Sequence, residues 1–460
     1  MAYPSRLSDV VVVGGGFAGV VAALSIANEG RRVLILDASA VPPRFSGDLI
    51  HPLGRQLLAD LGVLPELLAC GAVSIDGFAV FPGTSQQAAT MLPYRESARG
   101  LVMDSRALGE TLRRAAASHP AIELHCGCEA VEILRRDGRV IGVRDAAGQE
   151  WCGRLTIVAQ GRHARLRRQL GFAEKPRPLS ISTALTLRDV PLPVQNYAHI
   201  FLPAAADGSG PLLAHTLGGG DVRVSIDLPR KVGEGPLSER ILRLDLDNLP
   251  AELAKGLRDT LHDHYAETEL ATRTTCAFRT RRCAAAGVAL IGDAAGCTHP
   301  ITGTGMTTAL VDAWILRQEL DRADRPRRDA TKALDRALLR YQQRRYRFAR
   351  PREHLAEGLY EIFCGSEDGT AALRHGLFHY WNGSHRSRRA SVALLSGEDS
   401  SLRRLFAEYL RVCTAAVRVI LATPRCGYDL PSLASILRRS VRTLSRFMRS
   451  AVGRPVVLSQ

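Results

Sequence analysis

Residues 9–19 read DVVVVGGGFAG and carry the clearest structural signal in this 460-residue chain. The valines at 10–13 form a continuous β-branched run, which is typical of a parallel strand buried on both faces. Gly14, Gly16 and Gly19 follow with the spacing G-x-G-x-x-G. In that motif the first glycine permits a tight turn, the second lets the backbone approach a pyrophosphate, and the third lets helix and strand pack closely. The stretch predicts a dinucleotide-binding turn; the alternative is a chance group of glycines.

The residues after the turn support this prediction. A helix is expected from Phe17 to Asn28, and its N-terminal amides would face the phosphate charge. A second strand at 32–36 ends at Asp37, about 20 residues beyond the turn, where a carboxylate accepts hydrogen bonds from a ribose. Strand, helix and acid together predict a Rossmann-type site, but they do not distinguish NAD from FAD.

A second cluster, far along the chain, indicates a flavin. A buried strand at 287–291 is followed by Gly292 and Asp293, and residues 299–306 read HPITGTGM at the start of a predicted helix. We expect Asp293 to bind the ribityl chain or the hydroxyls near the phosphates. The backbone amides of 303–306 would face the N1–C2=O edge of the isoalloxazine, where preorganised donors stabilise the charge of the reduced flavin. The alternative is a structural turn after a strand.

Between these clusters the hydropathy pattern changes. From about residue 179 to 280 apolar and polar positions alternate, as in an antiparallel sheet with one solvated face, and beyond about 350 the pattern is mostly helical. We predict an α/β fold in which a Rossmann-type FAD-binding domain is interrupted by an antiparallel-sheet substrate domain and followed by a C-terminal helical region. The predicted ranges are 1–75, 98–172 and 281–349 for the FAD-binding domain, 76–97 and 173–280 for the substrate domain, and 350–460 for the C-terminal region.

The composition is that of a globular protein, with 46% hydrophobic residues, 23% charged residues and a net charge of +15. This basic balance favours anionic surfaces, and since no nucleic-acid-binding motif is present, we expect lipid headgroups and no nucleic acid. The ten cysteines fit neither a zinc pattern nor a secreted disulfide framework, so we expect no metal and a reducing compartment. We find no signal-peptide pattern and no apolar run of about 20 residues, so a cytoplasmic protein is expected.

The chain resembles the FAD monooxygenases of the aromatic-hydroxylase and squalene epoxidase group, and squalene epoxidases in particular. Three segments carry the resemblance beside the N-terminal glycine turn: 299–307 in the second cluster, which matches "HPLTGGGMT", 155–161, which matches "LTVVADG", and 394–397, which reads LLSG. The resemblance covers nearly the whole chain and implies that Arg44, Leu49, Arg106, Asp293 and Met306 contact FAD. A guanidinium pairs well with phosphate, although each arginine alone could also be a solvated surface charge.

Three positions depart from the family pattern. Gln160 replaces an Asp that in the family bridges the flavin and nicotinamide sites, which argues against direct reduction of FAD by NAD(P)H. NAD(P)H is still the expected electron donor, either directly or through a reductase. His51 stands where squalene epoxidases carry Gln, and Phe78 where they carry Tyr, which suggests a changed substrate. His51 either positions the substrate or is a structural histidine, and we expect His299 to be structural.

These arguments give one set of predicted site residues. Residues predicted at the substrate or flavin face are His51, Phe78 and Pro300. Residues predicted to bind the cofactor are Gly14, Gly16, Phe17, Ala18, Gly19, Asp37, Ala38, Arg44, Leu49, Arg106, Gln160, Gly292, Asp293, Gly303, Thr304, Gly305 and Met306.

The C-terminal region suggests contact with a membrane. Residues 433–448 place leucine, valine and methionine on one helical face and arginines on the other, as in a helix that lies in a membrane interface. The segment Leu402–Ala422 is also apolar, but Arg411 and Arg418 interrupt it, so it could lie shallowly in lipid and not span. Both segments could instead pack on their own domain or in a dimer. The resemblance favours peripheral attachment, since squalene epoxidases attach through C-terminal helices.

The resemblance also implies a reaction. Reduced FAD and O2 would give a C4a-hydroperoxyflavin whose distal oxygen passes to a hydrophobic substrate. We predict epoxidation or hydroxylation of a small lipophilic isoprenoid or polyene-like substrate, and aromatic-ring hydroxylation of a lipophilic natural product is the nearest alternative. An FAD-dependent isoprenoid reductase or desaturase, and a flavin-bound membrane module without turnover, are further alternatives.

Overall fold

The computed structural model describes most of the chain. The described residues are 8–41, 47–83, 88–172, 175–202, 209–230, 236–244, 246–263, 270–280, 282–324, 329–365 and 369–422. Two predictions lie outside them: the FAD contact of Arg44 and the amphipathic helix at 433–448.

A mainly parallel sheet forms around the N-terminal valines. Its strands are β1 (Ser8–Val13), β2 (Val33–Asp37), β8 (Ile122–Cys126), β9 (Ala130–Arg136), β10 (Arg139–Asp145), β11 (Glu150–Val158), β17 (Ala284–Ala285) and β18 (Val288–Leu290). The strands β18, β11, β1, β2 and β8 lie side by side in that order and run parallel. The hairpin of β9 and β10 pairs with the first half of β11, and it turns at Asp137 and Gly138, whose φ angles are 48° and 76°. Positive φ at both central residues is what a two-residue hairpin turn of type I′ requires.

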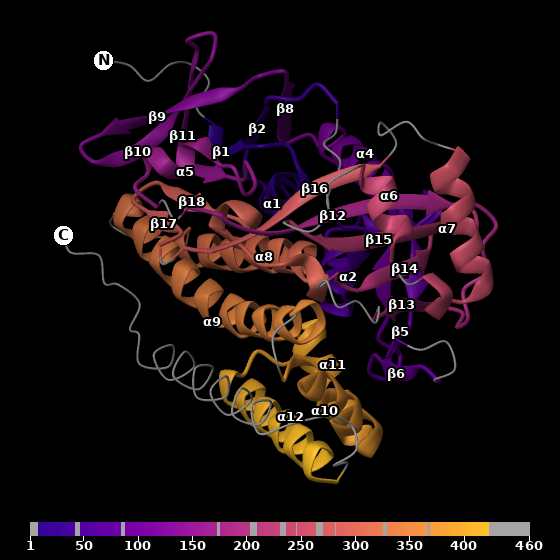
Figure 1. Cartoon of the computed structure of the whole chain (residues 1–460). Coiled ribbons are helices and arrows are strands. Elements are labelled where there is room, and N and C mark those ends of the chain that lie inside the picture. The colour runs from indigo at the N-terminus through magenta and orange to yellow at the C-terminus, as the bar shows by residue number, and fades with distance from the viewer. Residues whose placement is uncertain are drawn as a thin grey trace.

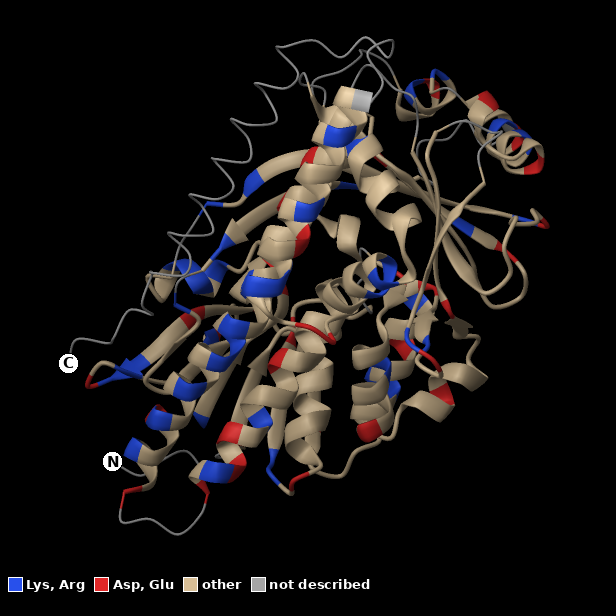
Figure 2. Ribbon diagram, turned by 90° about the horizontal axis from the view of Figure 1, so that it is seen from below, with Lys and Arg blue, Asp and Glu red and all other residues tan. Residues whose placement is uncertain are grey.

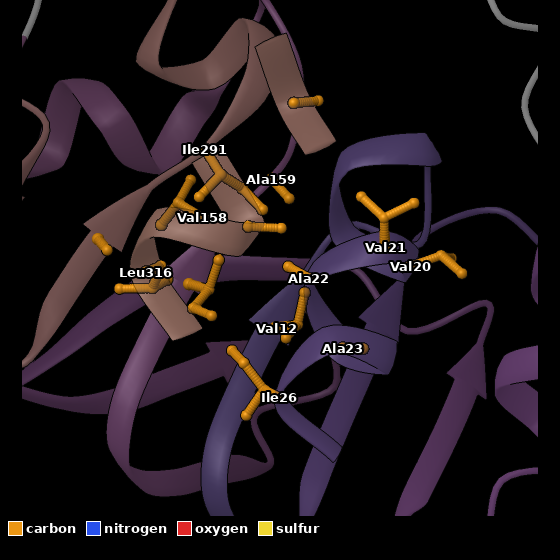
Figure 3. Packing of buried hydrophobic residues seen from close by; sticks show 14 of the residues in the cluster. Val12, Val20, Val21, Ala22, Ala23, Ile26, Val158, Ala159, Ile291 and Leu316 are labelled. Atoms are coloured by element: carbon orange, nitrogen blue, oxygen red, sulfur yellow. The ribbon is translucent and has the colours of Figure 1, made fainter. Parts of the chain in front are cut away.

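The helix after each glycine cluster packs against this sheet. The helix α1 (Phe17–Ala27) follows β1, and α8 (Gly305–Ala323) packs against α1. Figure 3 shows Val12 of β1, Ala22 of α1 and Leu316 of α8 among the side chains of one apolar core. The two clusters, almost 300 residues apart, therefore belong to one folded unit.

A second sheet covers the other part of the molecule. Its strands are β5 (Gly77–Phe81), β6 (Thr90–Pro93), β12 (Arg177–Leu187), β13 (Tyr197–Phe201), β14 (Leu212–Thr216), β15 (Val222–Pro229), β16 (Ala271–Arg279) and β19 (Gly296–Cys297). They follow the order β19, β16, β12, β15, β14, β13, β5 and β6, and each neighbouring pair is antiparallel except β13 and β5. The helices α6 (Leu237–Leu242) and α7 (Ala251–Asp263) and the 3-10 turn η1 (Leu246–Asn248) share an apolar cluster with one face of this sheet.

Shorter elements connect the two sheets. A small antiparallel sheet has the order β3 (Leu49–Ile50), β7 (Gly100–Val102) and β4 (Val73–Ile75). The remaining short elements are α2 (Pro52–Asp60), α3 (Leu64–Ala69), α4 (Ser105–Ala117), α5 (Arg165–Gln169), η2 (Gly292–Ala295) and η3 (Pro300–Thr302).

The C-terminal region is helical, as predicted. It contains α9 (Ala330–Cys364), α10 (Thr370–Gly383), α11 (His385–Ser396) and α12 (Leu402–Ala422), and Figure 1 shows the last three grouped at the bottom of the view, below α9. The crossing of α10 and α12 is close, because a Cβ added at Gly376 would lie 2.6 Å from the backbone of Ala416. The segment Leu402–Ala422 therefore packs on neighbouring helices. Among the described residues, no helix combines the length and the apolarity that crossing a bilayer requires.

The predicted fold class is confirmed: a mixed α/β fold with a Rossmann-type unit, an antiparallel-rich sheet and a helical C-terminal region. We propose that the domains follow the two large sheets, with β5 and β6 joining β12–β16 as the predicted range 76–97 requires. One short strand differs, since β19 lies within the range predicted for the FAD-binding domain but pairs with β16. Figure 2 shows Lys and Arg residues on many elements rather than on one face of a single element.

Candidate functional site

The N-terminal glycine turn leaves no room for side chains. Gly14 has a φ angle of +109°, and a Cβ there would lie 2.6 Å from the carbonyl oxygen of Ala159. A Cβ on Gly19 would lie 1.8 Å from the carbonyl oxygen of Gly14, so helix and strand touch at this point. Gly16 is the N-cap residue of α1 and no side chain caps the helix. The first-turn amides of α1 are thus left to a ligand, and a phosphate group is the ligand that a bare helix N-terminus favours.

The second glycine cluster lies directly against the first. Gly292 has a φ angle of +56°, and a Cβ there would lie 2.7 Å from the Cβ of Ala18 in α1. The Gly292 amide donates to Asp312 Oδ2 over 2.9 Å, and Arg345 Nε lies 3.0 Å from the same oxygen. Both charged side chains are buried, so this ion pair of α8 and α9 fixes where β18 ends. Sequence reasoning missed Asp312 and Arg345, which in the sequence are single charges in helical segments.

Asp293 follows this turn, and its carboxyl group is available for hydrogen bonds from a ligand. None of the described residues hydrogen-bonds to it. Burial raises the pKa of Asp293, and the guanidinium groups of Arg162 and Arg345 oppose that shift. A partly buried acid without donors is costly to leave unpaired. The hydroxyls of a ribityl chain or sugar would satisfy it, so this residue fits an FAD.

Asp37 lies at the end of β2 with part of its hydrogen-bonding capacity in use. Arg113 Nη2 of α4 lies 2.8 Å from its Oδ2, and the amide of Ser39 donates to its Oδ1 over 3.2 Å. A carboxylate has about four lone-pair sites, so the pair leaves capacity for ribose hydroxyls. The adjacent Ala38 is exposed. Sequence reasoning missed Arg113, whose distance of 76 residues from Asp37 gives no local signal.

The segment at 299–306 is anchored to the second sheet by His299. Its Nε2 lies 2.9 Å from Ser180 Oγ and 3.2 Å from Asp227 Oδ1, and its Nδ1 accepts from the amide of Ile301 over 3.2 Å. Both ring nitrogens are therefore engaged in holding the segment, which supports the structural role expected for His299. Pro300, predicted at the substrate or flavin face, is exposed.

The end of this segment lies against the small sheet. Gly303 has a φ angle of +62°, and a Cβ there would be 3.1 Å from Leu49 Cδ2. Thr304 is the N-cap residue of α8 without a side-chain cap, and a Cβ on Gly305 would meet no atom within 4 Å. Met306 reaches within 4.0 Å of the position of a Cβ on Gly47. The start of α8 thus offers free amides beside open space, as the predicted flavin edge requires.

His51 occupies a closed polar junction next to Gly303. The imidazole is fully buried, its Nε2 lies 2.8 Å from the carbonyl oxygen of Thr302, and its Nδ1 lies 2.9 Å from the hydroxyl of Tyr94. Because the carbonyl can only accept, Nε2 carries the proton and Nδ1 accepts from Tyr94. Burial lowers the pKa of His51 to about 4. The ring of Phe78 lies 5.9 Å from the imidazole centre. Sequence reasoning missed Tyr94.

Two predicted FAD contacts point to other partners in this structure. The Arg106 side chain is mostly exposed and pairs with Glu110 at 2.9 Å, one turn along α4. Gln160 accepts from the amide of Leu166 over 3.2 Å and donates to the carbonyl of Ala130 over 3.4 Å, so it joins α5 to β9. Their contacts with FAD stay predictions.

A large apolar pocket begins beside this junction. Its empty space, opening included, is about 1360 Å3, and it is bounded by the second sheet, the 301–303 segment and the four C-terminal helices. The apolar side chains that line it are Leu49, Phe78, Val80, Leu92, Ile200, Leu213, Ile301, Leu355, Leu359, Ile362, Phe363, Leu377, Trp381, Val392, Leu394, Leu395, Leu405 and Val412. A pocket of this kind suits a long hydrophobic ligand.

Several polar groups on the pocket wall are paired with one another. The Tyr380 hydroxyl donates to Glu408, which also lies 2.5 Å from Arg411 Nη1, and the Trp381 indole donates to Ser391 over 2.9 Å. Because these polar groups already have hydrogen-bond partners, an apolar ligand bound beside them would leave none of them unsatisfied.

Comparison with known proteins agrees with this geometry. The squalene epoxidase family model matches residues 152–430, which is more than half of the chain, and an FAD binding domain model matches residues 9–54. The chain is 28% identical to squalene epoxidase 1 of Arabidopsis thaliana, covering 91% of this chain and 79% of that protein. It is 26% identical to the squalene monooxygenase of Mus musculus, covering 84% of this chain and 68% of that protein.

Solved structures share the fold. A probable FAD-dependent monooxygenase of Pseudomonas aeruginosa superposes with a TM-score of 0.62 at 21% identity, covering 84% of this chain and 99% of that one. A flavin-dependent brominase superposes with a TM-score of 0.69 at 16% identity, covering 96% of this chain and 100% of that one. The chain therefore belongs to the squalene epoxidase family and is an FAD-dependent monooxygenase.

Proposed function

We propose that this monooxygenase epoxidises or hydroxylates a small lipophilic substrate, an isoprenoid or polyene-like chain, with FAD and O2. The observation that carries the proposal is the apolar pocket, one end of which is formed by Leu49, Thr302 and Gly303 beside the proposed flavin edge. The pocket extends from there to Val412 of α12. A long chain with few polar atoms matches such a wall, whereas an ionised aromatic acid would leave its charge unpaired in it.

The residues of the chain have separate tasks in this proposal. The amides at the start of α1 would hold the pyrophosphate, Asp37 the ribose, and Asp293 the ribityl side. The amides at the start of α8 would stabilise the negative charge of the reduced ring. When bound, FAD supplies the activation of O2 and the oxygen transfer, which no side chain can perform.

Around the reacting end, the chain would exclude water and fix geometry. Leu49, Phe78 and Ile301 line the pocket with apolar atoms. His51 is neutral, and both of its ring nitrogens are in use, so we assign it to positioning the 302–303 segment rather than to proton transfer. We propose the same indirect role for Tyr94.

The electron donor and the location are also proposals. NAD(P)H would reduce FAD directly or through a reductase; the side chain of Gln160, turned to Leu166 and Ala130, favours neither route. We propose a cytoplasmic protein that contacts the membrane face peripherally, because Leu410 and Leu421 of α12 are 43% and 68% exposed. Binding to anionic liposomes, compared with a Leu410→Ser, Leu421→Ser variant, tests this: equal sedimentation of both proteins would remove the argument.

The test of function is oxygen consumption by the FAD-loaded protein with a panel of squalene, linear polyenes and lipophilic phenols, followed by product mass. We expect a gain of one oxygen atom with a chain substrate. Gain of oxygen only on the phenols would favour the aromatic hydroxylase, and a change of two hydrogens without oxygen would make the protein a reductase or desaturase.

A further inference from the structure

Two cysteines lie side by side next to the proposed cofactor site. Cys276 is on β16 and Cys297 on β19, and their Sγ atoms are 3.8 Å apart. The Cys297 thiol also lies 3.2 Å from the carbonyl oxygen of Cys276. Since Phe278 pairs with Cys297 in the sheet, Cys276 is two residues along the neighbouring strand and projects to the same face. Cys276 is buried and Cys297 is partly exposed.

The pair lies in a positively charged environment. Arg162 donates to the carbonyl of Thr274 over 2.9 Å, and Arg167 donates to the carbonyl of Ala294 over 3.3 Å. The Nε atom of Arg167 is buried without a hydrogen-bond partner, and the Arg162 guanidinium interacts with the thiol of Cys276. Within the described ranges, the hydrogen bonds of both guanidinium groups to oxygen go to backbone carbonyls and not to carboxylates. Electropositive surroundings of this kind favour the thiolate form of a cysteine.

The same contacts favour a thiolate at one of the two sulfurs. A hydrogen bond from Cys297 and the charge of Arg162 hold the pKa of Cys276 below its usual range, although burial and the carboxyl of Asp293 oppose the shift. The pKa of Cys297 is raised, chiefly by its hydrogen bond to Cys276. The pair therefore combines an acidified thiol with a protonated one in contact.

We propose that Cys276 and Cys297 form an oxidisable dithiol that reduces hydrogen peroxide and closes to a disulfide. The Cys276 thiolate attacks one peroxide oxygen, the O–O bond breaks, and water leaves after the departing oxygen takes a proton. The resulting sulfenic acid is attacked by Cys297, so that the S–S bond forms, the S–O bond breaks and a second water leaves. Two thiols lose one electron each, and one peroxide gains both.

The peroxide has a source at this place. Reduced flavin that reacts with O2 without completing oxygen transfer releases hydrogen peroxide, and the cysteines are close to the residues that we propose hold the flavin. Cys297 lies between Asp293 and His299, two residues before the latter. In a disulfide the two sulfur atoms are about 2.05 Å apart. Closure therefore moves β19 toward β16, and with it the segment that contains Asp293.

The experiment uses the full-length FAD-loaded protein, reduced and then freed of reductant. Samples are treated with stoichiometric hydrogen peroxide, alkylated and digested for peptide mass analysis. We expect a peptide linked through Cys276 and Cys297, its loss after dithiothreitol, and complete loss of the link in Cys276→Ser. Cys283→Ser is the matched control: Cys283 is buried, its pKa is raised to about 12 by burial, and the link should form as in the wild type.

Three results would overturn the proposal. Both cysteines could remain alkylatable after peroxide, Cys276 could end as a sulfinic acid without a linked peptide, or peroxide could link the exposed Cys70 and Cys126 instead. Circular dichroism of each variant shows whether a missing link has its origin in misfolding, and Cys297→Ser provides a second variant. The peptide readout does not depend on finding the substrate.

Discussion

The substitution His51→Gln should make the protein more tolerant of acid. His51 is neutral in the folded protein because burial lowers its pKa from 6.5 to about 4, so protons bind the unfolded chain more tightly than the folded one. Stability linked to this group is complete above about pH 7 and is lost as the pH falls from 6.5 to about 4. The loss amounts to about 2 kcal/mol between about pH 8 and pH 5, and to about 3 kcal/mol at about pH 4.

Glutamine keeps both hydrogen bonds of the junction without titrating. Its amide can donate to the carbonyl of Thr302 and its oxygen can accept from Tyr94. Urea unfolding, followed by circular dichroism at about pH 8 and pH 5, measures the free energy of unfolding of both proteins. Wild type should lose about 2 kcal/mol more than His51→Gln on acidification.

His51→Leu is the matched control. It also lacks the titrating imidazole, but it leaves the Thr302 carbonyl and the Tyr94 hydroxyl without their hydrogen-bond partners. It should therefore already be about 1–3 kcal/mol less stable than wild type at about pH 8. If His51→Gln were as acid-sensitive as wild type, the imidazole would not be held neutral by burial, and the reasoning would be refuted.

Four other substitutions test the remaining parts of the site. Gly19→Ala places a Cβ 1.8 Å from the Gly14 carbonyl oxygen, so it should lower the free energy of unfolding by about 3 kcal/mol and reduce the amount of bound flavin. The control Gly383→Ala, whose Cβ would meet no atom within 4 Å, should change the stability little. A yellow, stable Gly19→Ala protein would contradict the close approach of helix and strand. Arg345→Met leaves Asp312 buried without its cation and should destabilise by about 3–5 kcal/mol in urea unfolding; a change below about 1 kcal/mol would show that the pair is unimportant. Asp293→Ala should weaken FAD binding roughly 10- to 150-fold in a fluorescence titration, the effect of losing about 1.5–3 kcal/mol, and unchanged affinity would remove the proposed contact. Leu377→Trp, inside the pocket, should raise KM for a chain substrate about tenfold without changing FAD content, and an unchanged KM would place the substrate elsewhere.

Sequence reasoning predicts best what is local. The glycine turn at 14–19 and the helix expected after it follow from signals within a few residues, and the structure has both the turn and the helix α1. The parallel pairing of β5 with β13 was not predictable in this way, because residues more than a hundred positions apart select each other only through the surrounding packing.

The same limit applies to the partners of the predicted site residues. Asp37 was predicted from its place after a strand, but Arg113 comes from a helix 76 residues away. The ion pair of Asp312 and Arg345 is invisible in the sequence because charged residues on helices are normally solvated, and only the packing of α8 on α9 shows that these two are buried.

The junction at His51 brings together two positions that depart from the family pattern, His51 and Phe78. Compared with the family pattern, Phe78 lacks a hydroxyl, and from the sequence this looked like a loss of polarity that implied a changed substrate. Phe78 on β5 pairs with Leu92 on β6, and Tyr94, two residues beyond Leu92, directs its hydroxyl to His51. The hydrogen bond to His51 therefore comes from a residue directly after β6 and not from position 78 on β5. Because the aromatic rings of Phe78 and Tyr94 meet edge to face at 5.8 Å, Phe78 is free to serve as an apolar wall of the pocket while Tyr94 supplies the polar contact behind it.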